Sequence, residues 1–446
     1  MDIAKMNVLT HGISRKKVAS TLGLISTLML PSIASAGLDV SNPSRKYEVT
    51  VIKGADLPIT GQPIEGYSVM AIENGKLSPI PFQFDDINTK GLPFVPGAAV
   101  KIDGIENIFE AKDELAFMYK DMGEKGEDSI LKNIQGTLIS ELEITEDGTS
   151  RYAYLVKGNA ERSNKVYAHY DFETGVIETE TYSIKFDPEN ITVWSDWKIK
   201  GFAGTHSAPK VLDTMKARFF IRLGFIKATL HNAILPAKTL AVKNGPIRSI
   251  VEADISIGAL GIDILSGGVS ATLTPGSIRF PIFALFPKAA SVLSELLIDV
   301  TLDYVDFEGA RYKTPLGPDE PLIAGQKVSD KVREQYKSNF ENPWVSISSG
   351  HNWDAFLISR FSEGFNPTVS ALYYDEGAGD KPIKPENVKG SSAEMGIRLS
   401  DIPVGNHVIF EHSVYFGPDL WQGNSPKRAA NAIFNPAKVS IKNFQP

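Results

Sequence analysis

The sequence predicts a mainly β protein whose strands are antiparallel. Short segments alternate between apolar and polar side chains, which is the period-2 pattern of half-buried strands. The 37 glycines and 27 prolines are spread without a period, so they favour strands joined by turns over long helices. Helical segments do not separate successive strands, as a parallel α/β sheet would require. We expect only a few short helices.

The first 36 residues have the order of a secretory signal peptide. A basic stretch at residues 15–17 precedes apolar residues 18–30 and a small-residue site that ends at Ala36. We expect Sec-type export, cleavage after Ala36 and a periplasmic or extracellular location. An N-terminal membrane anchor is the alternative, but the apolar run is shorter than the roughly 20 residues that a spanning helix needs.

Charge and cysteine content exclude several classes of partner and chemistry. Residues 1–36 carry four of the 46 basic and one of the 53 acidic residues, so their removal leaves a net charge of about −10. This balance argues against nucleic acid and against an anionic membrane surface as partners. The chain has no cysteine, which excludes disulfides, a lipid-modified cysteine and thiolate chemistry. The most apolar later region, residues 255–300, is interrupted by charged residues, so we expect no transmembrane segment in the mature chain.

The first half of the mature chain reads as strands and turns. Asn74 and Gly75 predict a tight hairpin after the strand at residues 67–72. That hairpin leads into a strand at residues 79–86, and we expect the strand at residues 114–119 to lie beside it. Further strands are predicted at residues 46–52, 151–157, 165–171 and 178–186. A turn-rich stretch at 187–205 marks a soft boundary between an N-terminal β domain (37–195) and a second part (196–446). That second part is a C-terminal β domain or the second half of one large sandwich.

The second half continues with strands and two helix candidates. Strands are predicted at residues 214–224, 241–252, 344–361 and 405–417. The helices are predicted at residues 285–297 and 327–339, the second strongly charged and exposed.

Acidic residues gather at the ends of two predicted strands. Asp85, Asp86, Asp113 and Asp121 offer the hard oxygen ligands that Ca²⁺ prefers, without the spacing of an EF-hand loop. Two such carboxylates could also act as acid and base in glycosidic chemistry if they lay about 5–10 Å apart. Strand ends of an acidic protein are also commonly acidic for solubility and turn geometry. The three interpretations stay open.

The other candidate site residues are aromatic or lie in a turn. His351 and Asp354 flank Trp353 in a glycine-containing turn, where a general base is well placed, although a surface histidine without a catalytic role is the alternative. Trp353 and Trp421 lie in turn-rich stretches, where an exposed ring can stack on a sugar. The nucleophile elbow, the Walker loop and the dinucleotide-binding fingerprint are absent from the sequence.

Three further motifs resemble a pattern in poorly characterised secreted bacterial proteins. They are Pro81-x-Gln83-x-Asp85, Asp113-Glu114-Leu115-x-Phe117-Met118-x-x-Asp121-x-Gly123, and Asn244-Gly245-Pro246-x-Arg248. Some of these proteins belong to domain-of-unknown-function families and occur near polysaccharide-degradation genes; Ala116 stands where they more often have Val. The resemblance implies a large β-sandwich of the carbohydrate-associated kind.

Export and the resemblance together suggest a role at the cell envelope. Our leading hypothesis is the binding or processing of a polysaccharide, with Trp353, Trp421 and Arg248 as ligand-binding candidates. The alternative is a non-catalytic component that scaffolds an outer-membrane or redox assembly. The first predicts exposed tryptophans along a groove with carboxylates at its floor, and the second predicts a flat apolar patch.

Overall fold

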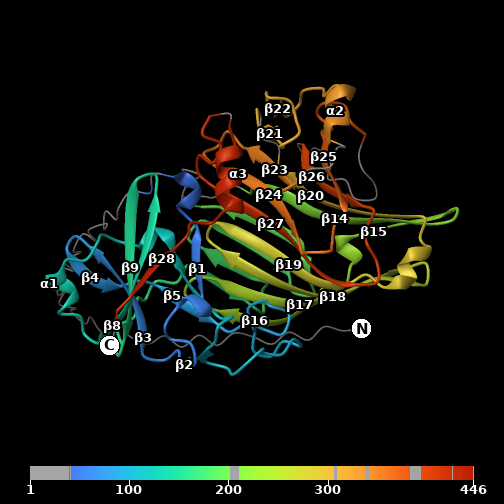
Figure 1. The fold of residues 1–446 in the computed structure, drawn as a ribbon. Coiled ribbons are helices and arrows are strands. Elements are labelled where there is room, and N and C mark those ends of the chain that lie inside the picture. The colour runs from blue at the N-terminus through green and yellow to red at the C-terminus, as the bar shows by residue number, and fades with distance from the viewer. Residues whose placement is uncertain are drawn as a thin grey trace, which may run out of the picture. The chain divides into compact units, whose positions relative to one another are not determined.

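The described part of the chain is mainly β-sheet. The computed structural model describes residues 40, 42–200, 210–305, 309–336, 341–381, 393–423 and 425–444, so the predicted cleavage after Ala36 lies outside the described residues. Within these ranges six sheets are formed, and the paired strands in them are all antiparallel (Figure 1). The predicted mainly β class is confirmed. A search of the same residues finds no helix that is long and apolar enough to cross a membrane.

Three sheets come mainly from the first 160 residues. A three-stranded sheet has the order β1 (Val49–Lys53), β7 (Glu114–Met118), β5 (Phe82–Asp85). A five-stranded sheet has the order β28 (Ser440–Asn443), β8 (Thr137–Glu146), β9 (Thr149–Lys157), β3 (Tyr67–Glu73), β4 (Lys76–Pro79). A small pair joins β2 (Gln62–Pro63) to β6 (Ile108–Phe109). As predicted, β5 and β7 are neighbours, with Phe82 opposite Phe117.

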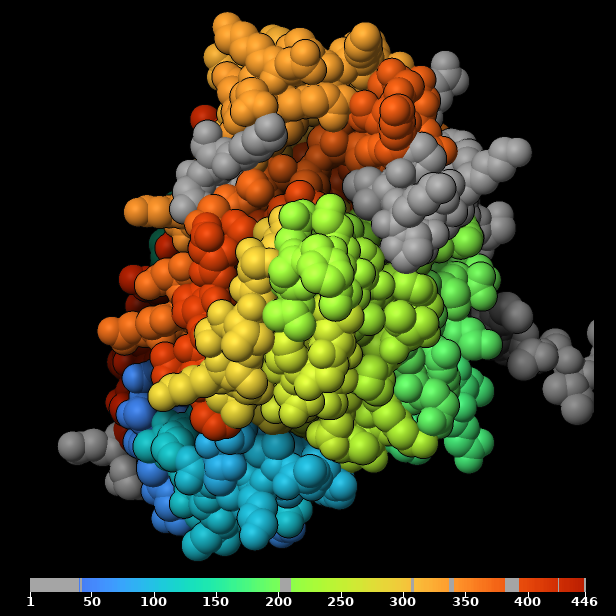
Figure 2. All heavy atoms as spheres, turned by 90° about the vertical axis from the view of Figure 1, so that its right-hand side faces the viewer, coloured from blue at the N-terminus to red at the C-terminus, as the bar shows by residue number. Residues whose placement is uncertain are grey.

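Two large sheets and one small sheet form the rest. The nine-stranded sheet has the order β16 (Thr239–Asn244), β17 (Ser249–Ala259), β18 (Ile262–Thr274), β19 (Ser277–Leu285), β27 (His407–Gly417), β24 (Asp354–Phe361), β23 (Trp344–Ser348), β21 (Arg311–Lys313), β22 (Leu322–Ile323). The second five-stranded sheet has the order β15 (Ile226–His231), β14 (Leu212–Leu223), β20 (Glu295–Tyr304), β26 (Glu394–Ser400), β25 (Thr368–Tyr374). A four-stranded sheet has the order β10 (Ala168–Asp171), β11 (Val176–Thr179), β12 (Tyr182–Asp187), β13 (Asn190–Ile199). The β14–β15 hairpin projects at one end of the large sheets, and Figure 2 looks onto that end.

Helices are few and short in the described residues. The α-helices are α1 (Asp128–Leu131), α2 (Asp330–Tyr336) and α3 (Lys427–Phe434), and the 3₁₀ turns are η1 (Pro43–Arg45), η2 (Gly54–Asp56), η3 (Tyr119–Asp121), η4 (Asn232–Ile234) and η5 (Lys288–Val292). The helix predicted within residues 327–339 is confirmed over Asp330–Tyr336. The helix predicted at 285–297 is wrong. Its middle is only the 3₁₀ turn η5, and β20 begins at Glu295, because that part of the chain pairs with β14.

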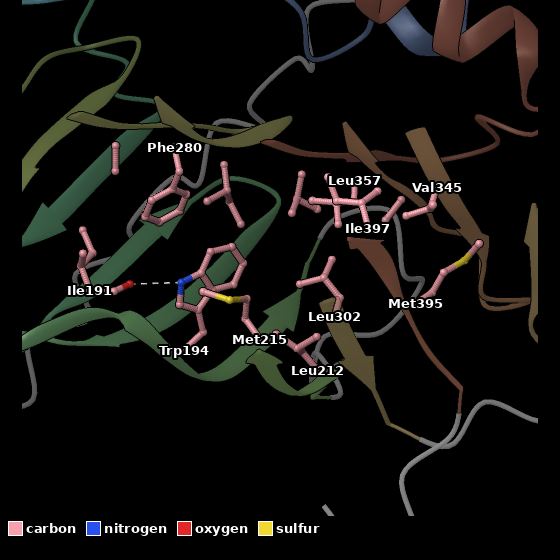
Figure 3. Close-up of a cluster of buried hydrophobic side chains, with 14 of the residues drawn as sticks. Ile191, Trp194, Leu212, Met215, Phe280, Leu302, Val345, Leu357, Met395 and Ile397 are labelled. Atoms are coloured by element: carbon pink, nitrogen blue, oxygen red, sulfur yellow. Dashed lines mark hydrogen bonds between the residues drawn. The ribbon is translucent and has the colours of Figure 1, made fainter. Parts of the chain in front are cut away.

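A large apolar core lies between the nine-stranded and the second five-stranded sheet. Phe280 and Leu357 come from the first sheet, Met215 and Leu302 come from the second, and their side chains point toward one another (Figure 3). The four-stranded sheet joins the same core through Trp194, whose Nε1–H donates to the Ile191 carbonyl. The alternation seen in the sequence therefore sorts apolar side chains into the space between sheets.

The buried clusters divide the chain earlier than the predicted boundary near 187–205. One cluster spans residues 52–155, and the large core begins at Ala168, so β10 to β13 pack with the second half. The last strand, β28, returns to pair with β8 in the first half. Strands β10 to β13, from the first half of the chain, thus pack with the second half, and β28, the last strand, pairs with the first half.

Candidate functional site

Residues of the quoted motifs and the adjacent Lys243 meet in one buried ion network, here called the motif network: Gln83, Asp85, Glu114, Lys243 and Arg248. Arg248 Nε donates to Asp85 Oδ2 at 2.8 Å, and its Nη2 donates to Glu114 Oε2 at 2.6 Å. Lys243 Nζ lies 2.8 Å from Asp85 Oδ1, and Lys53 pairs with Glu114. These contacts join β5 and β7 to the turn between β16 and β17. The motifs thus hold the first sheet against the large sandwich.

Gln83 packs closely against Gly245 in the turn Asn244-Gly245-Pro246. Gln83 Oε1 accepts the backbone N–H of Ile247 at 3.2 Å and of Arg248 at 3.1 Å. A Cβ atom on Gly245 would lie 2.1 Å from the same oxygen, so a larger residue there would displace the Gln83 side chain from these hydrogen bonds. Gln83 also donates to Asp85 at 2.8 Å, which fixes the carboxylate for Arg248.

Charges keep the acids of the motif network ionised. Burial by itself would raise the pKa of Asp85, but Arg248 and Lys243 outweigh it and hold that pKa below the usual range. The pKa of Glu114 is lowered in the same way, against burial, by Arg248 and Lys53. Lys53, which lies outside the motif network, is the third cation in contact with these two carboxylates, and Lys243 also attracts the neighbouring Asp86.

Three of the four predicted calcium ligands bind different protein groups. Asp85 belongs to the motif network, and Asp113 accepts the N–H groups of Ile87 at 3.0 Å and Glu110 at 2.6 Å. Asp121 Oδ1 accepts the Tyr167 hydroxyl at 2.6 Å. Asp86 is buried, and burial raises its pKa, to which the neighbouring charge of Asp113 adds. Among the described residues, no three or more His, Cys, Asp or Glu side chains are grouped to hold a metal ion.

Trp353 and Trp421 are each only 1% exposed, so the predicted exposure of these rings is wrong. Trp353 packs against Tyr304, with ring centroids 5.9 Å apart, in the core of the large sandwich. Trp421 belongs to a smaller cluster, and Arg311 lies 5.3 Å over its ring. Large aromatic side chains release the most free energy when buried, and here packing takes precedence over sugar stacking.

His351 and Asp354 have different surroundings. His351 is exposed in the turn between β23 and β24, and its backbone N–H donates to Ser349 Oγ at 3.0 Å. Asp354 is buried, and its Oδ2 accepts the backbone N–H of Trp421 at 2.8 Å. Burial raises the pKa of Asp354. Asp354 therefore fixes the chain around Trp421.

A cavity of about 420 Å³ lies on the other face of the nine-stranded sheet, and Arg248 is at its edge. We call it the arginine cavity. Its polar wall is formed by side chains of four sheet strands: Thr272, Thr274, Ser277, Arg279, Arg360 and Tyr415. Its opposite wall is largely apolar and comes from η1, from β1, and from the end of α3 with the residues that follow it. The apolar side chains there are Pro43, Val49, Val51, Ile433, Phe434 and Pro436.

Two arginines share one carboxylate at the polar wall. Arg279 binds Glu411 in a bidentate manner, with Nε to Oε1 at 3.2 Å and Nη2 to Oε2 at 2.6 Å. Arg360 Nη1 reaches Glu411 Oε1 at 3.1 Å. The two arginines carry one more charge than Glu411 alone can balance, and Glu114, which also lines the cavity, attracts Arg279 more weakly. Arg279 Nη1 has no hydrogen-bond partner in the described part of the chain, and 38% of the Arg279 side chain is exposed.

Arg279 and Arg360 also set the ionisation of Glu411. Burial would raise the pKa of Glu411, but Arg279, the Ser413 hydroxyl and Arg360 outweigh it and lower the pKa to about 2. The same pairing raises the pKa of Arg279 against the effect of burial. All three groups are charged at neutral pH.

The sequence reasoning missed Arg279, Arg360 and Glu411. Each is a charged residue within an alternating strand, which is a signal for an outward-facing side chain but not for a shared site. They meet because β27 lies between β19 and β24, with Arg279 opposite Ser413 and Arg360 opposite Glu411.

A second buried charge network lies on the second five-stranded sheet. Glu394 accepts from Arg218 Nη1 at 2.6 Å, Lys216 Nζ at 2.9 Å and Thr301 Oγ1 at 2.5 Å. Lys216 also pairs with Asp303 at 2.6 Å. A further pair, Arg398 with Asp299, lies beside it at 2.6 Å. Its three cations match three carboxylates, so this network is balanced and we treat it as structural.

Comparisons with known proteins find likenesses among solved structures. No family model and no curated protein matches the chain. The chain is similar to an α-mannosidase from Enterococcus faecalis V583, with a TM-score of 0.47 and 10% identity over 91% of this chain and 45% of that one. It is also similar to a protein in glycosyl hydrolase family 38 from Enterococcus faecalis, with a TM-score of 0.45 and 9% identity over 91% and 46% of the two chains. This chain thus spans about half the length of those two structures.

Proposed function

We propose that the arginine cavity binds a segment of an acidic polysaccharide. The observation that carries the proposal is the pair Arg279 and Arg360 around the single carboxylate of Glu411. It presents unbalanced positive charge and an open N–H donor at the wall of a cavity. Guanidinium groups bind carboxylate and sulfate groups with strong, directional hydrogen bonds.

The size and the two walls of the cavity suit a sugar. A volume of about 420 Å³ is within the usual range for small-ligand sites, roughly 300–1,000 Å³. A sugar ring has polar edges and an apolar face, so its hydroxyls can meet Thr272, Thr274 and Ser277 while its face lies against Val51 or Phe434. A convergent polar pocket also favours binding over the alternative of a scaffold with a flat apolar patch. The role at the envelope rests on the predicted signal peptide.

Binding is better supported than processing. A glycosidase needs one carboxyl group that carries a proton near neutral pH and a second that is ionised. Glu411 and Glu114 at this wall are both held ionised by arginine. Glu48 has a raised pKa from burial, but its oxygens already accept from Arg45 at 2.5 Å and from the Ala437 N–H at 2.8 Å. Among the described residues at this cavity, Glu48, Glu114 and Glu411 therefore do not form such an acid–base pair.

The test is a glycan array of acidic and neutral polysaccharides, followed by titration of the best ligand with Arg279→Gln. This change is suitable because Arg360 still compensates Glu411. We expect the wild type to prefer acidic glycans, the variant to bind at least tenfold more weakly, and added salt to weaken wild-type binding.

Arg222→Gln is the matched control. Arg222 lies on β14, pairs with Glu295 at 3.1 Å, and its side chain is 39% exposed, which closely matches Arg279. The control should bind like the wild type. The proposal fails if the wild type binds no acidic glycan, or if both variants lose the same affinity.

A further inference from the structure

Three loops converge at the end of the large sandwich that Figure 2 faces. They are the β14–β15 turn at residues 223–226, the β17–β18 turn at 259–262, and the β19–β20 connection at 286–294, which contains η5. The Ser294 N–H donates to the Arg222 carbonyl at 2.9 Å, which places the third loop beside the first. Ser266 lies opposite Leu285, so the second loop extends beside the third. Both views show the β14–β15 hairpin and the η5 segment at this end.

Each loop exposes a large apolar side chain. We call these residues the apolar tips: Phe225, Ile226, Leu260 and Val292. Phe225 is 95% exposed, Val292 is 59% exposed, and the other two are 44% and 37% exposed. A phenylalanine side chain is rarely left in water to this extent, because its burial is strongly favourable.

The backbone conformation of two of these turns does not require an apolar side chain. Leu260 has a φ of +57°, and it is the only apolar residue among the non-glycine residues with positive φ in the described ranges; the others are Asn, Asp or Gln. A bulky side chain is disfavoured in this region, where Asn, Asp or Gly would relieve the turn. At the β14–β15 turn, Gly224 supplies the positive φ of +58°, so Phe225 is not needed for the geometry. An exposed leucine at a strained backbone position points to a role for the side chain itself.

The charges of the three loops are nearly balanced, with a small excess of basic residues. Residues 222–227, 259–263 and 286–295 contain three basic residues, Arg222, Lys227 and Lys288, and two acidic residues, Asp263 and Glu295. Arg222 is paired with Glu295. Lys227 and Lys288 form no ion pair within the described residues. The three loops thus have one basic residue in excess, and the adjacent loop at residues 400–406, whose Gly405 N–H donates to the Phe286 carbonyl, adds the acidic Asp401.

We propose that the apolar tips insert into the surface of a lipid bilayer, as a peripheral anchor independent of the arginine cavity. Single apolar side chains on separate loops fit a fluid lipid surface, which needs no matching shape, whereas a protein partner would need a complementary one. Lys227 and Lys288 lie where their ammonium groups can reach lipid phosphates while their stems lie along apolar surface. The overall negative charge disfavours long-range attraction to anionic lipid, so apolar insertion is the main driving force.

A tryptophan at the tip gives a direct signal. All five native tryptophans are 5% exposed or less, so their fluorescence should not respond to vesicles. The emission of Phe225→Trp should shift to the blue on addition of phosphatidylcholine–phosphatidylglycerol vesicles, and lipids labelled with a quencher near the headgroup should quench it. An unshifted, unquenched spectrum overturns the proposal.

Sedimentation with the same vesicles tests the wild-type side chain. Phe225→Ser should lower the vesicle partition coefficient at least tenfold, and vesicles of phosphatidylcholine alone should still bind the wild type. Phe172→Ser is the control, because Phe172 is also an exposed phenylalanine, 49% exposed, outside the three loops. The proposal fails if the wild type does not sediment with vesicles or if the two variants lose the same binding. It also fails if the wild type forms a dimer that Phe225→Ser abolishes, since a second copy would then cover the tips.

Discussion

Replacing Glu252 by glutamine should make the protein more resistant to unfolding at alkaline pH. Glu252 lies on β17, is 2% exposed, and its Oε1 has no hydrogen-bond partner in the described chain. Burial raises its pKa from 4.5 to about 7, and Asp254 adds to the shift. Ser270, on the neighbouring strand, lies close enough to oppose the shift in part but does not meet hydrogen-bond geometry.

The magnitude follows from linkage between ionisation and folding. Below pH 4.5 the side chain is protonated in both the folded and the unfolded protein, and the native state carries no penalty. As the pH rises toward 7 and above, the unfolded chain ionises first, so the wild type loses stability. A shift of about 2.5 pKa units at roughly 1.4 kcal/mol each amounts to about 3 kcal/mol, complete by about pH 8.

Denaturant unfolding at fixed pH values between 4.5 and 8.5 measures this effect. The free energy of unfolding of Glu252→Gln minus that of the wild type should rise by about 3 kcal/mol across the series, because other titrating groups cancel in the difference. A difference that does not change with pH would refute the reasoning, as would a wild type that gains stability relative to the variant.

Two further predictions concern the other carboxylates. Treatment with a chelator should leave the melting temperature unchanged. Asp113→Asn should lower the free energy of unfolding by only about 0.5–1.5 kcal/mol, because Asp113 accepts backbone N–H groups. A lower melting temperature after chelation, restored by Ca²⁺, would contradict this. Glu394→Gln should lower the free energy of unfolding by about 3–5 kcal/mol, because it leaves the buried Lys216 and Arg218 undercompensated. Glu295→Gln, in a pair whose side chains are more than a third exposed, should cost less than about 1 kcal/mol, and equal costs for the two variants would contradict the buried network.

Part of the candidate site could be predicted from the sequence. The motifs that contain Gln83, Asp85 and Arg248 were recognised, and the structure brings them together, but as a structural network. The sequence could not show this, because Arg248 lies 163 residues after Asp85 and their contact depends on how the β16–β17 turn meets β5. The arginine cavity was missed for the same reason. Arg279 and Glu411 are 132 residues apart, and only the pairing of β19 with β27 brings them together.

The sequence by itself determined the features that depend on neighbouring residues. Asn74 and Gly75 adopt positive φ in the predicted hairpin, and the alternation in β5 and β7 made them strands. Local chemistry suffices there, because turn type and strand periodicity are set within a few residues. The tertiary structure decided what each strand face meets. It buried Trp353 and Trp421, turned the predicted helix at 285–297 into η5 and β20, and left Phe225 exposed. These outcomes depend on which distant segments cover a surface, and periodicity carries no information about that.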